Sequence, residues 1–354
     1  MKKLLFIALV ALATNAVAGD NVFSPADTHI QYVGRISFQN PERPRFSYPG
    51  TQINVAFEGT TLRMKCKPGS GYFMARVDEA EPFKIAFRGP RDSVVTLCTA
   101  MPQGRHTAQV MYCIEGYEYK PEFWGFITDG RLADPPALPA TKFEFIGNSI
   151  TCGYGNEGRL GEPFAFETEN HYYSYVQLTM RSLGGVASII ARSGIGAYRN
   201  YGEPKTGSPG YNMPAQYEYT LYNDHSERWD FSRWQPDVVC INLGTNDLST
   251  EPYDTGLLKQ GYKTLLAQVR KGAPKAKVVF LCGSMLRGPI LDICKRILNE
   301  VAEEARKSGD KQVYRFDFTP IDGSLGFGSD WHPSLRRHEV MADELTTFLR
   351  QLVK

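Results

Sequence analysis

Residues 142–155 read Lys142-Phe143-Glu144-Phe145-Ile146-Gly147-Asn148-Ser149-Ile150-Thr151-Cys152-Gly153-Tyr154-Gly155, and this stretch decides the fold of the chain. Its first half is an apolar run interrupted by Glu144, as expected for a strand. The run leads into Gly147, a small polar pair and further glycines, which allow the backbone to turn sharply. Open α/β sheets place their chemistry at the carboxyl ends of strands. Ser149 therefore stands where a nucleophile would lie, although an isolated Gly-x-Ser often occurs by chance.

Downstream of this stretch, the hydrophobic pattern alternates between strand-like and helix-like segments. Strands are predicted at 143–146, 186–191, 238–243, 278–282 and 313–318, and helices at 172–183, 257–270, 290–307 and 335–352. The run 238–243 is continuously apolar, which is typical of a strand buried on both faces. Segment 199–234 is aromatic and is expected to be irregular. The alternation predicts a three-layer α/β domain with a parallel sheet and right-handed crossovers.

The first third of the mature chain has an all-β pattern. Short alternating runs lie at 30–38, 52–57, 61–66, 71–77, 83–87, 93–98, 104–113 and 123–128, separated by turn clusters. Regularly spaced short strands predict a β-sandwich, plausibly a jelly roll. The proline-rich stretch 132–139 is expected to be a stiff linker, because proline excludes helix. The predicted domains are therefore a β-sandwich over 19–136 and an α/β domain over 137–354.

Residues 1–18 have the pattern of a secretory signal peptide. Lys2 and Lys3 precede an apolar stretch, 4–13, that is too short to span a bilayer. Ala16-Val17-Ala18 is a small-x-small cleavage signature. The sequence therefore predicts an exported protein, either periplasmic or extracellular.

Composition excludes some partners and leaves others open. The 40 Lys+Arg residues nearly balance 38 Asp+Glu residues, which argues against nucleic acid or an anionic membrane as the main partner. Aromatic residues make up 12% of the chain, which suits sugar recognition and a large core equally well. None of the seven cysteines shows the spacing of a metal site. Cys240 and Cys282 lie in apolar strand patterns and are expected to be reduced core residues, and no disulfide pairing is assigned.

Three further segments should reach the same sheet edge as Ser149, because each follows or closes a predicted strand region. They are Ala191-Arg192-Ser193-Gly194-Ile195-Gly196, Ile241-Asn242-Leu243-Gly244-Thr245-Asn246-Asp247 and Ser329-Asp330-Trp331-His332-Pro333-Ser334. Together they supply a hydroxyl, backbone amides, a side-chain amide, an acid and an imidazole. This is the set of groups needed for acyl transfer through a serine.

The role of each residue follows from what the chemistry needs. A serine hydroxyl is a weak nucleophile until a base takes its proton, and His332 is the best candidate base. Asp330 is the candidate acid that would orient the imidazole through its Nδ1 proton. The developing oxyanion needs preorganised donors, which the N–H groups of Ser149 and Gly194 and the side-chain amide of Asn246 would supply.

Each of these residues also has a purely structural interpretation. Gly194 suits a positive φ, Asn246 suits a turn, and Trp331 suits a core. Because Trp331 adjoins the candidate base, we expect its ring to wall the acetyl or sugar pocket. Asp247 is predicted to cap a turn without a catalytic role. His338, in the last predicted helix, is expected at the surface.

The four segments resemble the SGNH (GDSL-like) hydrolase superfamily, whose signature residues match Ser149, Gly194, Asn246 and His332 in order. The preceding β domain and the Asp-Trp-His-Pro end resemble carbohydrate esterase family two, which would extend the likeness to nearly the whole mature chain. That resemblance implies a jelly roll packed on an SGNH domain and deacetylation of xylan, mannan or related sugars. The chain has Gly-Asn-Ser in place of the usual Gly-Asp-Ser, and Asp330 lies two residues before the histidine instead of three.

Three functions compete at this point. The first is a secreted serine esterase that removes acetyl groups from polysaccharides or oligosaccharides through an acyl-enzyme. The second is a carbohydrate-binding protein that has lost catalysis, and the third is a lipase or thioesterase on the same fold. The first interpretation requires no metal and no cofactor. The acetylated sugar, the position of its ester and the oligomeric state stay open, as does the choice between Asp330 and a backbone carbonyl as the group that orients His332.

Overall fold

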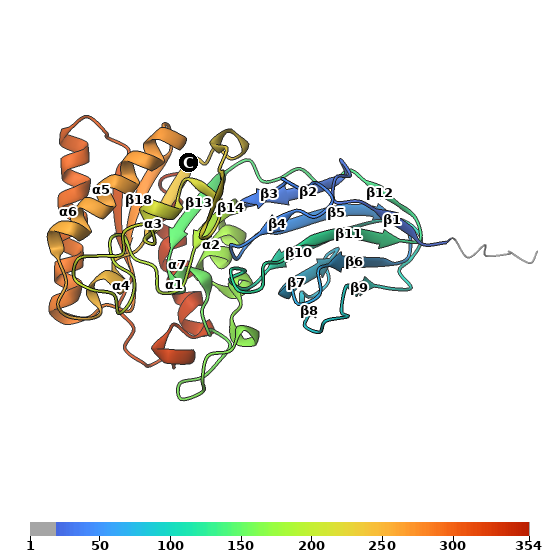
Figure 1. Cartoon of the computed structure of the whole chain (residues 1–354), viewed down its shortest axis with the longest axis horizontal. Coiled ribbons are helices and arrows are strands. Elements are labelled where there is room, and N and C mark those ends of the chain that lie inside the picture. Colours follow the sequence, from blue (N-terminus) through green and yellow to red (C-terminus); the bar gives the residue numbers. More distant parts are fainter. Residues whose placement is uncertain (1–18, 354) are drawn as a thin grey trace, which may run out of the picture.

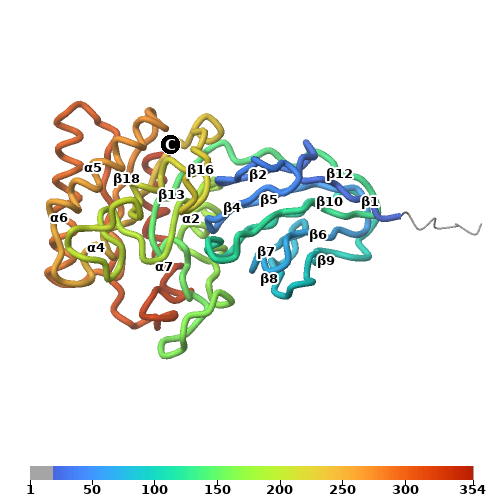
Figure 2. The backbone as a smooth tube through the Cα atoms, viewed as in Figure 1, coloured from blue at the N-terminus to red at the C-terminus, as the bar shows by residue number. Residues whose placement is uncertain are grey.

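The computed structural model describes residues 19–353, so the predicted signal peptide at 1–18 lies outside the described residues. The chain forms two lobes that pack side by side, one built from strands alone and one from strands and helices (Figure 1). In the tube view, blue to blue-green segments make the first lobe and later segments make the second (Figure 2). Among the helices of this described part, none is both long and apolar enough to cross a bilayer.

The first lobe is a sandwich of two antiparallel sheets. One sheet has the order β1 (Asn21–Phe23), β11 (Phe123–Thr128), β6 (Leu62–Cys66) and β9 (Val94–Cys98). The other has the order β12 (Arg131–Ala133), β5 (Gln52–Glu58), β10 (Arg105–Tyr112), β7 (Gly71–Val77) and β8 (Phe83–Phe87), with β2 (Ile30–Val33) also paired to β5. A short ribbon joins β3 (Ile36–Ser37) to β4 (Arg45–Phe46). Phe57, Phe73, Phe87 and Phe126 fill the space between the sheets.

The second lobe is built on a parallel sheet with the order β14-β13-β17-β18-β19. Its strands are β13 (Lys142–Gly147), β14 (Val186–Ala191), β17 (Val238–Asn242), β18 (Lys277–Cys282) and β19 (Val313–Asp317). The chain starts in β13, moves outward to β14, and then crosses back to β17 on the other side. This reversal places a topological switch point between β13 and β17, which is where such sheets hold their sites.

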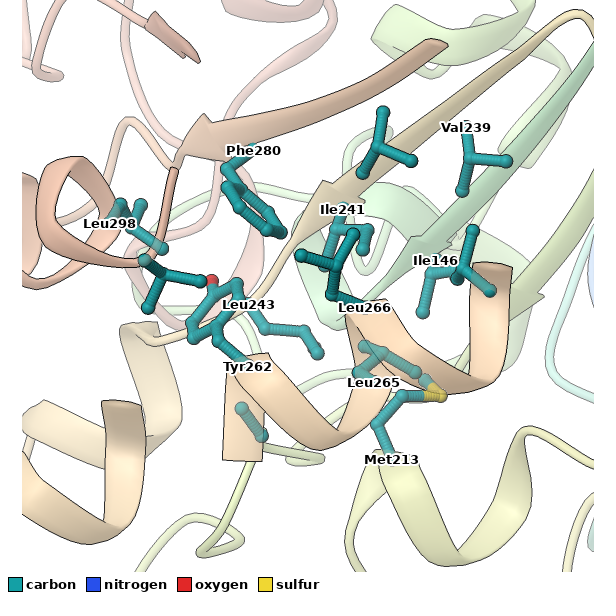
Figure 3. Close-up of a cluster of buried hydrophobic side chains, with 14 of the residues drawn as sticks. Ile146, Met213, Val239, Ile241, Leu243, Tyr262, Leu265, Leu266, Phe280 and Leu298 are labelled. Atoms are coloured by element: carbon teal, nitrogen blue, oxygen red, sulfur yellow. The ribbon is translucent and has the colours of Figure 1, made fainter. Parts of the chain in front are cut away.

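Helices cover both faces of the parallel sheet. The long ones are α2 (Tyr175–Leu183), α5 (Thr255–Gly272), α6 (Gly288–Lys307) and α7 (Leu335–Leu349). Alternate side chains of a strand point to opposite faces: Phe143 and Phe145 pack with α2 and α7, whereas Ile146 packs with α5 and α6. Figure 3 shows the second of these cores, with Phe280 of β18 and Leu298 of α6. The three-layer architecture predicted from the sequence is confirmed, as is the sandwich before it.

Shorter elements occupy the connections. They are α1 (Ser149–Cys152), α3 (Met213–Gln216), α4 (Thr245–Leu248), the 3-10 turns η1 (Phe166–Thr168), η2 (His171–Tyr173), η3 (Phe231–Arg233) and η4 (Ser329–Trp331), and the hairpin of β15 (Tyr219–Leu221) with β16 (Asp224–Arg228). The hairpin lies in 199–234, which was expected to be irregular. The stretch predicted as a linker, 132–139, begins inside β12, so its first two residues belong to the sandwich.

Three strands of the parallel sheet end at the same level. Gly147 at the end of β13 is paired in register with Ala191 on one side and Asn242 on the other. The segments that follow are therefore brought to one edge of the sheet, as the sequence predicted. That edge is the carboxyl end of the parallel sheet, where the catalytic residues are expected.

Two expectations about buried residues had different outcomes. All seven cysteines are free, and Cys240 and Cys282 are buried in strands as predicted. The expectation of a surface position for His338 was wrong, because the residue is fully buried on the side of α7 that faces α2. It lies one helical turn from Met341 and Ala342 on the inward face of α7, and that spacing sets its burial.

A buried ion pair links the two lobes. Arg35 of the sandwich lies 3.6 Å from Glu144 of β13, and both side chains are almost fully buried. Arg35 also donates to the carbonyl of Tyr219 at 2.9 Å, and the Tyr217 hydroxyl donates to Glu144 at 2.7 Å. Burial raises the pKa of Glu144, and the charge of Arg35 opposes that shift. The pair needs both partners, because a lone charge at this depth would be uncompensated.

Replacing Glu144 with glutamine should therefore destabilise the protein by about 3 kcal/mol, since it leaves Arg35 buried without its counter-charge. Chemical denaturation of purified protein measures the change. The matched control is Glu58→Gln, which removes the exposed pair with Arg131 and should cost less than about 1 kcal/mol. Equal effects of the two substitutions would contradict the structural role of the buried pair.

Candidate active site

Ser149 lies at the first position of α1, directly after β13. The turn is possible because Gly147 has no side chain: a Cβ there would meet the Thr151 hydroxyl at 2.1 Å. Asn148 caps the helix, and its side-chain oxygen accepts the N–H of Ile150 at 3.1 Å. Asparagine thus keeps the turn in the place where the superfamily usually has aspartate.

The structure brings Ser149 and His332 into contact across 183 residues of sequence. The distance between Ser149 Oγ and His332 Nε2 is 2.8 Å. Nδ1 of the same ring lies 3.2 Å from the carbonyl oxygen of Ser329 and 3.1 Å from that of Asp330. Carbonyl oxygens only accept hydrogen bonds, so the neutral ring carries its proton on Nδ1. Nε2 is therefore free to accept the serine proton.

The carboxylate of Asp330 does not make the contact that its predicted role requires. It accepts the hydroxyl of Tyr154 at 2.8 Å, while the backbone carbonyl of the same residue faces the imidazole. Asp330 and Trp331 both have left-handed backbone, with φ of 50° and 65°. This pair of left-handed residues turns the carbonyl toward the ring and the side chain away from it. Of the two alternatives left open by the sequence, the geometry favours the backbone carbonyl.

One aromatic ring packs against the imidazole, and others lie close by in sequence or in contact with that ring. The ring of Tyr154 lies 4.3 Å from that of His332 and stacks on Phe164 at 3.9 Å. Trp331 is 60% exposed and packs edge-on against Phe327, at 5.1 Å between ring centroids. Its indole is therefore available at the surface beside the histidine, and its predicted contact with substrate stays a prediction.

The predicted oxyanion donors come from three neighbouring loops. Gly194 has a φ of 79°, in the left-handed region, as its glycine suits. The Asn246 side-chain amide donates one hydrogen to the carbonyl of Ile195 at 2.8 Å, which leaves its second hydrogen for another acceptor. In the described part of the chain, the N–H groups of Ser149 and Gly194 make no hydrogen bond to protein. Each of the three groups thus has a hydrogen available, and their joint role as an oxyanion hole stays a prediction.

Asp247, beside Asn246, has the structural role predicted for it. The buried carboxylate accepts backbone N–H groups of Ala197 at 3.0 Å, Tyr198 at 2.8 Å and Arg199 at 3.0 Å. It also accepts the N–H of Gly244 at the start of α4. Asp247 thereby ties the loop after β14 to the loop after β17.

Sequence reasoning missed a buried cluster that includes Cys152 of α1. The acidic side chains of Glu115 and Glu169 and the thiol of Cys152 lie within 4.8 Å of one another. Arg192 lies 2.9 Å from Glu115 and neutralises it. Burial and the charge of Glu115 raise the pKa of Glu169 well above its ordinary value. The motif stretches already contained Cys152 and Arg192, but no pattern pointed to Glu115, which comes from the sandwich.

The buried histidines have distinct electrostatic environments. Burial lowers the pKa of His332, whereas the two carbonyls at Nδ1 act in the opposite direction. Burial lowers the pKa of His171 to about 4 and that of His338 to about 3. In the sandwich, a carbonyl and the carboxylate of Asp78 raise the pKa of His106.

Comparison with known families matches both lobes. Residues 32–136 match the family described as Carbohydrate esterase 2 N-terminal. Residues 145–340 match the GDSL-like Lipase/Acylhydrolase family.

Several characterised proteins are similar to the chain. It is 30% identical to an acetylxylan esterase / glucomannan deacetylase of Cellvibrio japonicus, over 99% of each protein. It is also 39% identical to the cellulase/esterase CelE of Acetivibrio thermocellus over 326 residues, which are 91% of this chain and 39% of that protein. The chain thus spans well under half the length of CelE. A solved family two carbohydrate esterase from Clostridium thermocellum, in complex with cellohexaose, superposes with a TM-score of 0.84 at 39% identity. That match covers 92% of this chain and 99% of the other.

Titration of the histidine rings by NMR tests the environment of the site without a substrate. His332 should lose its proton at a pH below 6.5, because burial disfavours the charged ring. His171 and His338 should stay neutral between pH 5 and 8, and His106 should titrate above 6.5. A midpoint for His332 above that of His106 would contradict the geometry described here.

Proposed function

The chain belongs to carbohydrate esterase family 2, and from that premise we propose that it removes acetyl groups from plant polysaccharides or their oligosaccharides through an acetyl-enzyme on Ser149. The observation that carries this proposal is the 2.8 Å contact between Ser149 Oγ and His332 Nε2. A nucleophile and its base within hydrogen-bond reach are the minimum for this chemistry.

In the first half of the reaction, Ser149 Oγ attacks the acetyl carbonyl while His332 Nε2 takes the hydroxyl proton. The carbonyl oxygen becomes an oxyanion, which can accept hydrogen bonds from the N–H groups of Ser149 and Gly194 and from the side-chain amide of Asn246. One such donor is worth about 3 kcal/mol of transition-state stabilisation. Collapse of the tetrahedral intermediate breaks the bond to the sugar oxygen, which leaves with the proton from His332. Ser149 then carries the acetyl group.

In the second half, His332 removes a proton from water, and the hydroxide attacks the acetyl-enzyme. Acetate leaves, and the proton returns from His332 to Ser149. During both halves the imidazolium donates from Nδ1 to the carbonyls of Ser329 and Asp330, which supports a dyad without a carboxylate in contact with the ring.

The substrate class rests on the relatives and on the surface around the histidine. Aromatic faces bind sugar rings through apolar contact. Exposed Trp331 beside His332 is suited to that role. A lipase would need a long apolar acyl groove, whereas an acetyl group needs only a small pocket. We propose acetylated xylan or glucomannan as the substrate class, in line with the activity named for the Cellvibrio relative.

We further propose that the protein acts outside the cytoplasm. Residues 1–18 have the composition of a signal peptide, and polymeric substrates are met outside the cell.

Acetate release tests the proposed function. Wild-type protein should release acetate from acetylated xylan or glucomannan and should hydrolyse p-nitrophenyl acetate faster than long-chain p-nitrophenyl esters. Ser149→Ala and His332→Ala should each lower kcat by at least about 10⁴-fold with folding intact, because each removes half of the nucleophile–base pair. Comparable rates on long-chain esters would favour a lipase, and substantial turnover by Ser149→Ala would remove the nucleophile assignment.

Asp330→Asn separates the two ways of orienting the histidine. Where a carboxylate holds the ring, this change costs about 10⁴-fold in kcat. Here the loss should stay below about tenfold, because asparagine keeps the backbone carbonyl, tolerates left-handed φ and still accepts the Tyr154 hydroxyl. Steady-state kinetics on p-nitrophenyl acetate measures the loss of kcat. The control is Asp322→Asn, which changes a carboxylate that accepts hydrogen bonds from nearby Ser324. A loss near 10⁴-fold would restore Asp330 as the orienting acid.

A further inference from the structure

We propose that Glu115, which the β-sandwich contributes, is a positioning residue for the oxyanion donor at Gly194. The role rests on the proposed function, because it concerns the same transition state. Glu115 lies in the segment after β10, and its carboxylate reaches across the domain boundary to the loop after β14. It would act through backbone geometry without touching the substrate.

The contacts of Glu115 end one residue before Gly194. Its Oε1 accepts the backbone N–H of Ser193. The same oxygen lies 2.9 Å from a guanidinium nitrogen of Arg192. Glu115 therefore binds the side chain of Arg192 and the backbone of Ser193, the two residues that precede Gly194. A buried carboxylate that accepts an N–H and pairs with arginine is held much more firmly than an exposed one.

The other side of Gly194 is fixed from within the α/β domain. The carbonyl of Ile195 accepts from Asn246, and the three amides that follow Gly196 donate to Asp247. Gly194 joins one segment anchored on α4 to another anchored on Glu115, and its own carbonyl accepts the N–H of Tyr201 at 2.8 Å. Because glycine has little conformational preference of its own, the direction of its N–H depends on both anchors.

The surroundings of Glu115 keep its carboxylate in place. The side chain is 2% exposed. The backbone near it is joined to the α/β domain by a hydrogen bond from His171 N–H to the carbonyl of Cys113, at 2.9 Å. Burial and the charge of Glu115 raise the pKa of its neighbour Glu169, which favours the neutral form of that side chain. Glu115 is thus the buried carboxylate paired with Arg192, and that pairing compensates its charge at a buried site.

A matched control exists in the same cluster. Glu118 also binds Arg192, at 2.6 Å, but its side chain is 42% exposed and, within the described residues, makes no hydrogen bond to Ser193. Substitution of Glu118 therefore removes a charge from the same arginine and leaves the Ser193 N–H bonded to Glu115. A difference in kcat between the Glu115 and Glu118 variants therefore reports the hydrogen bond from the Ser193 N–H to Glu115.

The kinetic test uses the full chain and p-nitrophenyl acetate. Glu115→Ala should lower kcat by about 10²-fold, the loss expected for a misplaced oxyanion donor, with KM within about threefold of wild type. Glu115→Gln keeps an acceptor for Ser193 and should recover about tenfold of that loss. Glu118→Gln should stay within about threefold of wild type in both constants. A general loss of structure would not produce this order together with an unchanged KM.

Hydrogen exchange measures the protection of backbone N–H groups in the loop after β14 and needs no substrate. Exchange at the hydrogen-bonded N–H groups of Ser193 and Ile195 should be faster in Glu115→Ala and unchanged in Glu118→Gln. This measurement keeps the inference separate from the proposed function, because it decides the positioning role even if the wild-type protein releases no acetate.

Three results would overturn the inference. They are a kcat for both Glu115 variants equal to that of Glu118→Gln, a loss confined to KM, or unchanged exchange at Ser193 and Ile195 in Glu115→Ala. Thermal unfolding checks that each variant is folded. If Glu115→Ala does not fold, Glu115→Gln decides alone. Its kcat should then be at least threefold below that of Glu118→Gln, and equality would overturn the role.

Discussion

The site depends on the register of one strand against its two neighbours. Gly147 in β13 is level with Ala191 in β14 and with Asn242 in β17. A shift of register would move the serine away from the loops on both sides and would turn apolar side chains to the wrong helical layer. The register is held because Phe145 and Ile146 fill different cores on opposite faces of the sheet. The position of the hydroxyl is thus a consequence of core packing.

A second layer of organisation lies between the domains. Arg35 and Glu115 of the sandwich are both buried, and each meets an opposite charge from the α/β domain. Buried ion pairs contribute little net stability, because desolvation offsets most of their attraction. They do impose a single relative placement, since any slippage would leave a charge buried without its partner. The two domains are therefore held in one arrangement beside the Ser149 edge.

Much of the fold could be predicted from local pattern. Alternation of apolar strands and helices after residue 141 is strong, and each site loop follows a strand end, so topology alone groups them. The hairpin in 199–234 was missed because its strands are short and one of them, β16, is polar and largely exposed. His338 was misplaced because its polarity was given more weight than its helical spacing from Met341 and Leu345.

The details of the site were harder to predict, for two physical reasons. The group that orients His332 is a backbone carbonyl, and every residue has one, so sequence carries no specific signal for it. Glu115 belongs to another domain and meets Arg192 only through tertiary packing. Ser149 and His332 could be found because their chemistry requires particular side chains.

The left-handed pair at Asp330 and Trp331 has a consequence for how this loop can vary over evolution. If the backbone carbonyl supports the imidazole, natural selection acts at position 330 on conformational tolerance more than on acidity. Asparagine and glycine adopt such a backbone readily, whereas valine, isoleucine or threonine would distort it. An apparent loss of the acidic residue among homologues would then be a neutral exchange, and a β-branched substitution there would mark a lineage that has abandoned hydrolysis.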